Sequence, residues 1–120
     1  MSTSQRLVII RHGPHASNAL REGLDVALVA AAFGEEVGLL FMGQGVFALL
    51  KEQGAGAPGQ KATLPTMNML EMYDINDLWV PQEALDELSL TPDHLREGVK
   101  CLPAAELPAL LARHEQVLTF

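Results

Sequence analysis

The residues of this chain whose types best suit chemistry are Arg11, His12 and Gly13, which directly follow the short apolar run 7–10. A histidine in such a place can act as a nucleophile that takes up a phosphoryl group. That chemistry also needs a pocket of cationic side chains, a second histidine and an acid. The motif therefore carries a function only if the rest of the chain supplies these groups.

The stretch from Arg11 to Asn18 resembles the signature of histidine phosphatases and phosphoglycerate mutases. The remaining sequence does not supply what that chemistry needs. His94 lies between predicted elements, His114 lies at the end of a predicted helix, and few arginines remain to bind a phosphate. The chain is also well short of the usual length of that family. We interpret the match as coincidence, and keep a small phosphohydrolase that uses His12 as the alternative function.

Metal and cofactor sites are not expected. His12 and His15 are close together in a loop and lack clustered carboxylates, so they do not form a metal-ligand pattern. Gly43-Gln44-Gly45 lacks the third glycine of a dinucleotide fingerprint and predicts a turn. His15 can still point into the cleft at the carboxyl ends of the strands, where open α/β sheets bind ligands, although a solvated loop histidine is more common.

Cys101 is the only cysteine, which excludes an internal disulfide and a thiolate metal cluster. Lys100 beside it and a predicted helix start at Pro103 are features that can activate a thiol. The residue nevertheless lies in an apolar segment, where a buried and inert cysteine is the usual case. We predict no catalytic residue and no enzymatic activity of the chain by itself.

The chain length predicts one domain, residues 1–120, because 120 residues suffice for a hydrophobic core. A net charge of −7 argues against direct binding to nucleic acid, which needs clustered lysine and arginine. No apolar run approaches the roughly 20 residues of a membrane span, and residues 1–10 do not fit a secretory signal. With one cysteine, a reducing compartment is expected, and we predict a cytoplasmic protein.

Strands that alternate with helices predict a three-layer α/β/α domain, with a mostly parallel five-stranded sheet like that of flavodoxin-like folds. The run 37–42 lacks the alternation of a half-exposed strand and predicts a strand covered on both faces. Gly43 and Gly45 then permit a turn before a short helix from Val46. The other predicted strands are 7–10, 78–80, 99–102 and 116–120; the other predicted helices are about 18–33, 66–73, 82–88 and 103–114.

The first predicted helix, capped by Ser17 or Asn18 and ended by Gly34, is apolar on two sides. A chain of this size cannot bury both sides by itself, so one stripe predicts a subunit interface; simple exposure is the alternative. The stripe expected to face the sheet is Leu20, Leu24, Ala27, Leu28 and Ala31. The stripe expected to face a partner is Val26, Val29, Ala30 and Phe33.

The helix at 66–73 is rich in methionine, with Met67, Met69 and Met72 beside Leu70. These side chains do not fit one helical face. Methionine suits adaptable contact surfaces as well as irregular cores, so an interface and a core position both remain open for these residues.

Several ordered segments spanning nearly the whole chain resemble the DsrE/DsrF-like family. They are Pro14-His15, Arg-Glu-Gly-Leu-Asp at 21–25, Phe-Met-Gly-Gln-Gly-Val-Phe at 41–47, Tyr-Asp-Ile at 73–75 with Leu-Trp-Val at 78–80, and Val-Leu-Thr-Phe at 117–120. Each segment alone is only modestly specific for the family, but the complete set in this order is a strong signal.

The resemblance implies a sulfur relay for 2-thiolation of the wobble uridine in tRNA. It implies TusB-like and TusD-like subunits as partners, in a dimer of heterotrimers, with sulfur carriers acting through the cysteine of the TusD-like subunit. This chain has no cysteine between its second strand and the methionine-rich helix, so the resemblance implies a non-catalytic subunit without a cofactor. The related DsrEFH complex serves dissimilatory sulfur oxidation, which the sequence leaves open.

Overall fold

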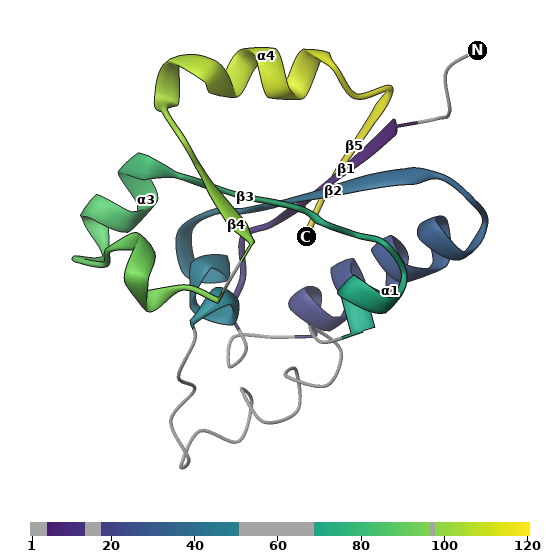
Figure 1. Cartoon of the computed structure of the whole chain (residues 1–120), viewed down its shortest axis with the longest axis horizontal. Helices are drawn as coiled ribbons and strands as arrows, with labels where there is room; N and C mark the ends of the chain where they lie inside the picture. The colour runs from purple at the N-terminus through teal and green to yellow at the C-terminus, as the bar shows by residue number, and fades with distance from the viewer. Residues whose placement is uncertain (1–4, 14–17, 51–68, 97) are drawn as a thin grey trace.

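The computed structural model describes residues 5–13, 18–50, 69–96 and 98–120, and it contains a five-stranded sheet in which all neighbouring strands are parallel (Figure 1). The strand order is β4-β3-β2-β1-β5, so the chain travels outward from β1 to β4 and then returns to the far side of β1. The predicted parallel α/β sheet is therefore confirmed. The strands are β1 (Gln5–Ile10), β2 (Glu36–Phe41), β3 (Asp77–Pro81), β4 (Val99–Leu102) and β5 (Gln116–Thr119).

Helices cover both faces of the sheet, as expected for a three-layer fold. Figure 1 shows α1 and α3 on one side and α4 on the other. Because the crossing from β4 to β5 reverses the direction of travel, a right-handed connection places α4 on the opposite face. The helical elements are α1 (Ala19–Ala32), the 3₁₀ helix η1 (Gly43–Leu49), residues 69–72, α3 (Gln82–Glu87), η2 (Pro92–His94), η3 (Ala104–Glu106) and α4 (Leu107–Ala112).

Each face of the sheet has its own hydrophobic core. Side chains alternate along β1, so Val8 and Ile10 face α1 while Leu7 and Ile9 face α4. The α1 side holds the larger core, to which η1 and α3 contribute. The core on the α4 side is smaller, consisting of Leu7, Ile9, Leu40, Trp79, Leu102 and Leu110. Burial on both sides explains why β1 and β2 read as continuous apolar runs.

The end of α1 follows the sequence prediction. Gly34 takes a positive φ of 88°, and the amide N–H of Glu35 donates to the Ala30 carbonyl at 3.1 Å. The Gly34 amide donates to Ala31 at 3.0 Å, which completes a Schellman motif. At the other end, Asn18 occupies the N-cap position without a side-chain capping bond, and Ser17 lies outside the described residues.

Two predicted helices begin differently in the structure. The helix after β2 begins at Gly43 rather than Val46 and is a 3₁₀ helix, because Gly45 packs directly against the carbonyl of Ile10 at the end of β1. The helix predicted at 103–114 begins with the short η3, and α4 starts only at Leu107. Pro108 then lies in the first turn of α4, where its missing N–H has no cost.

Within the described residues, the structure contains no helix with both the length and the apolar character that crossing a bilayer requires.

Gly45→Ala is expected to destabilise the fold, because the new Cβ would overlap the Ile10 carbonyl oxygen. Shifting the backbone of β1 to relieve this overlap would disturb the centre of the sheet. We expect a loss of about 2 kcal/mol in the free energy of unfolding, in the range for overpacked sites. Urea denaturation followed by circular dichroism measures it. Gln44→Ala, at the exposed neighbouring position of η1, is the control and should stay within about 0.5 kcal/mol. Equal midpoints for the two variants would contradict the close contact.

Candidate functional site

The carboxyl ends of the strands, where open α/β sheets bind ligands, carry few reactive groups in the described structure. Arg11 and His12 follow β1 and are exposed, and Gln44 lies exposed beyond the end of β2. Gly13 is buried against the backbone of Gln44, so the two loops contact each other. His15 lies outside the described residues.

The structure does not assemble a phosphoryl-transfer site around His12. His114 precedes β5 and therefore lies at the opposite, amino-terminal end of the sheet from His12. His94 is engaged within its own turn, where its Nδ1 accepts the amide N–H of Thr91 at 3.0 Å. The described histidines thus do not supply the second histidine that the chemistry requires.

Cys101 lies on the edge strand β4 and packs, half-buried, against the core on the α1 side. Burial raises the pKa of its thiol above the ordinary value, because removal from water disfavours the thiolate. Since the thiolate is the nucleophilic form, the thiol is poorly reactive at neutral pH.

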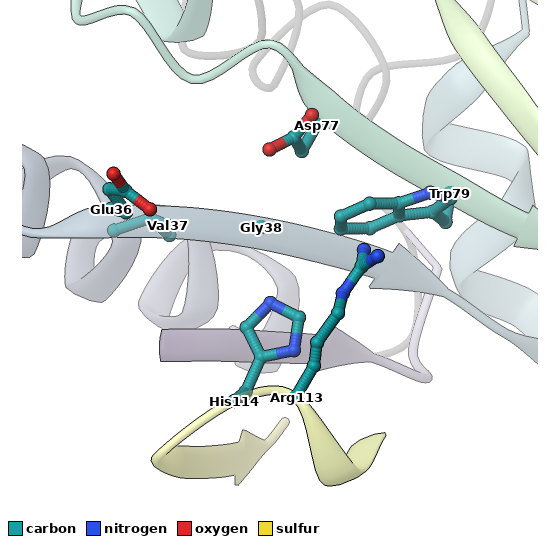
Figure 2. Close-up of a pocket in the computed structure, with 7 residues that line it drawn as sticks. All are labelled: Glu36, Val37, Gly38, Asp77, Trp79, Arg113 and His114. Atoms are coloured by element: carbon teal, nitrogen blue, oxygen red, sulfur yellow. The ribbon is translucent and has the colours of Figure 1, made fainter. Parts of the chain in front are cut away.

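A pocket of about 240 Å³ opens at the amino-terminal ends of β2 and β3, on the α4 side of the sheet (Figure 2). We call it the amino-end pocket. Its floor is Gly38, where any side chain would collide with the Trp79 ring. The lining residues are Glu36, Val37, Gly38, Asp77, Trp79, Arg113 and His114.

The polar groups of the amino-end pocket are organised around Trp79. The His114 ring meets the indole edge to face, with ring centroids 6.1 Å apart, and Arg113 lies over the indole at 5.5 Å. Lys100 lies 5.6 Å from the same ring and pairs with Asp77 at 3.0 Å. The contacts of Arg113 and His114 with the indole hold the segment that follows α4 against the sheet.

His114 has a defined hydrogen-bonding arrangement. Its Nδ1 donates to the Leu110 carbonyl at 2.7 Å, which leaves Nε2 near Gly38. The described lining includes no thiol or hydroxyl, and among the described residues no three His, Cys, Asp or Glu side chains are placed to hold a metal ion. The amino-end pocket therefore offers polar binding groups, with no thiol or hydroxyl nucleophile among the described lining residues.

The second apolar stripe of α1 is largely at the surface. Phe33 is 83% exposed and Val29 is 56% exposed, while Val26 is half-buried. Together with Arg6, Asp25, Ala30 and Glu35 they line a groove of about 400 Å³, which we call the α1 groove. Ala30, assigned to the same stripe, differs from its neighbours: it is 6% exposed and packs in the core, because it lies next to the sheet-facing side of the helix.

The methionine-rich segment is divided between core and surface. Leu70 is buried, whereas Met72 is 79% exposed and Met69 is 39% exposed; Met67 lies outside the described residues. A hollow lined by Ala31 of α1, by Gly34 and by residues 73–75 lies between the end of α1 and the residues that follow this segment. Each of the two helical segments therefore carries exposed apolar side chains of its own.

Sequence reasoning missed the amino-end pocket. Trp79 is far in the chain from Arg113 and His114. They meet only because the strand order puts the segment between α4 and β5 over the starts of β2 and β3. The only available signal was a pair of basic residues, Arg113-His114, at the end of a predicted helix.

Comparison with known sequences gives a consistent result. A model described as DsrE/DsrF-like family matches residues 5–120. The chain is 37% identical over 117 residues to "Protein TusC homolog" of Pseudomonas aeruginosa, covering 97% of this chain and 98% of that protein. It is 36% identical over 113 residues to "Protein TusC" of Klebsiella pneumoniae (strain 342), covering 93% and 95% of the two chains.

Solved structures show the same fold at lower sequence identity. The crystal structure of the YchN protein from E. coli matches with a TM-score of 0.73 and 22% identity, over 97% of this chain and 99% of that chain. A protein of unknown function from Methanobacterium thermoautotrophicum matches with a TM-score of 0.67 and 13% identity, over 92% and 90%.

The Cys101 thiol is expected to react slowly with iodoacetamide. At pH 8, below the ordinary pKa of 9.0, burial leaves a smaller thiolate fraction in the folded protein than in the unfolded chain. We expect the rate constant to be lower in the folded protein, with its pH midpoint shifted upward. Mass spectrometry of the single adduct measures it, and the same protein in urea is the control. A folded rate equal to or above the unfolded one would contradict an inert thiol.

Proposed function

The chain belongs to the DsrE/DsrF-like family, and on this basis we propose that it is a non-catalytic subunit of a sulfur-relay complex that supports 2-thiolation of the wobble uridine in tRNA. Its partners in this proposal are TusB-like and TusD-like subunits, joined in a dimer of heterotrimers. The relatives from Klebsiella pneumoniae and Pseudomonas aeruginosa are named "Protein TusC" and "Protein TusC homolog", and these names support the proposed kind of subunit.

The observation that carries the proposal is the exposed apolar surface of α1. Val29 and Phe33 are exposed at the C-terminal end of the helix and line the α1 groove, and Met69 and Met72 are exposed on a separate segment. Large contiguous apolar patches are uncommon on proteins that work alone and typically mark contact sites. A partner subunit that covers this surface removes it from water.

A non-catalytic role agrees with the chemistry of the described residues. The thiol of Cys101 is held mainly in its protonated form, which neither attacks a persulfide nor accepts sulfur readily. In the proposed complex the TusD-like subunit supplies the relay cysteine, and the sulfur carriers act through that subunit. This chain contributes shape and contact surface.

The charge of the chain also supports an indirect role toward tRNA. A net charge of −7 repels phosphate groups, so the proposed subunit stays away from the RNA while other components bind it. We place the complex in the cytoplasm, where tRNA is modified. A DsrEFH-type role in dissimilatory sulfur oxidation is the alternative within the same family, and a strain that lacks this gene distinguishes the two by its thiouridine content.

The isolated chain is expected to self-associate or aggregate, and to become well behaved when co-expressed with TusB-like and TusD-like partners. Covering Val29 and Phe33 in the complex removes the apolar surface that drives association. Size-exclusion chromatography with light scattering measures both states.

Phe33→Ser tests which surface is responsible. We expect it to reduce aggregation of the isolated chain and to weaken the complex at least about tenfold, because a largely exposed phenylalanine at an interface centre carries much of the binding energy. Ala109→Ser, at an exposed position on α4 in the opposite layer, is the control. A stable monomer indifferent to both partners would refute the proposed function.

Cys101→Ser is expected to leave tRNA thiolation unchanged in a strain that depends on this gene. The side chain is replaced by one of similar size, so the fold should remain, and no relay step is lost if the TusD-like subunit holds the acceptor thiol. Thiouridine content measured by mass spectrometry of digested tRNA is the readout. Loss of thiouridine with normal complex assembly would instead identify Cys101 as a relay residue.

A further inference from the structure

We propose that the open edge of β5 accepts an extended strand from a partner subunit, and that side chains of this strand fill the α1 groove. This inference rests on the proposed function, since it assumes that the chain works as a subunit.

Among the described residues, the backbone of β5 is paired on one side only. β5 is the last strand of the sheet and pairs only with β1 in the described structure. The Phe120 amide donates to the Ile9 carbonyl at 2.8 Å, and the Phe120 carbonyl accepts the Arg11 amide at 2.8 Å. Because alternate residues of a parallel strand bond to the same neighbour, the backbone groups of Val117 and Thr119 point away from β1. They form an open row of donors and acceptors.

Nothing in the sequence of β5 protects this edge. Exposed edges are usually guarded by charged side chains, proline or bulges, yet residues 116–119 are Gln, Val, Leu and Thr. The opposite edge strand, β4, carries the exposed Lys100 in its middle and is followed by Pro103. The edge of β5, which has no charged residue or proline, is therefore the edge that we expect a partner to cover in the assembly.

The α1 groove lies above the same edge. Arg6 of β1 reaches from the groove to a hydrogen bond with Gln116 of β5. Gln116 and Leu118 face the α1 side, because their partners in register are Arg6, which lines the groove, and Val8 of the core below α1. A strand added beside β5 thus has one set of alternate side chains directed at Val26, Val29 and Phe33.

The charges of the groove define the partner strand further. Arg6 is already paired with Glu35 at 2.9 Å, so it adds little net charge. Asp25 is exposed at the groove and forms no ion pair within the described residues. The fitting occupant is an extended segment with apolar residues at alternate positions and one lysine or arginine facing Asp25. A second copy of this acidic chain is a poorer match than a partner that supplies this charge.

Hydrogen exchange on the complex tests the strand directly. We expect the amides of Val117 and Thr119 to exchange at least about tenfold more slowly in the assembled complex than in the isolated chain, because they become hydrogen-bonded. The amide of Phe120, already bonded to β1, is the internal reference. Asp25→Lys should weaken assembly, whereas Asp25→Asn should weaken it less.

Val117→Pro and Val117→Thr form a matched pair. Proline removes the outward donor but leaves the pairing of residues 116, 118 and 120 with β1, and edge strands tolerate it. Threonine changes the side chain and keeps the donor. We expect proline to raise the dissociation constant at least about tenfold and threonine at most about threefold, with similar urea midpoints for the two variants.

Three results would count against the inference. A complex that forms while Val117 and Thr119 exchange at unchanged rates would overturn strand addition and leave the proposed function intact. An isolated homodimer that protects these amides would make a second copy the occupant. Failure of any complex to form with the partners would overturn the proposed function and this inference with it.

Discussion

An all-parallel sheet must be covered on both faces, and this requirement governs the whole molecule. Four successive strands proceed in one direction across the sheet, and the described helices between them, α1, η1 and α3, all lie on a single face. The other face is covered after the single return crossing, by the short α4 and the segment that follows it. Leu110 is the one buried residue of α4 in that small core, where it packs with Trp79, Leu7 and Leu40.

The strands and the end of the first helix were predictable from local patterns. β-branched and leucine-rich runs identified β1 and β2, because strands buried on both sides show no polar alternation. Gly34 marked the end of α1, since a left-handed C-terminal residue is seldom anything else. Val99–Leu102 was predicted without error because Gly98 and Pro103 bound it.

Other features depend on long-range contacts and could not be predicted. The 3₁₀ form of η1 follows from the contact of Gly45 with the end of β1, and the local sequence does not predict this contact. Ala30 lies between the two stripes of α1, and only the actual rotation of the helix on the sheet decides that it is buried. The amino-end pocket required the strand order, because Trp79 and His114 belong to elements that are neighbours only in space.

The grouping of Trp79 with Lys100, Arg113 and His114 has a spectroscopic consequence. The chain has a single tryptophan, and its indole is buried beneath two cations and beside an imidazole on the face that α4 covers. Its fluorescence therefore reports on the docking of the C-terminal layer and not on the opposite core. Emission that changes before the circular dichroism signal during denaturation would mean that this thin layer opens first, as a separate cooperative unit of the protein.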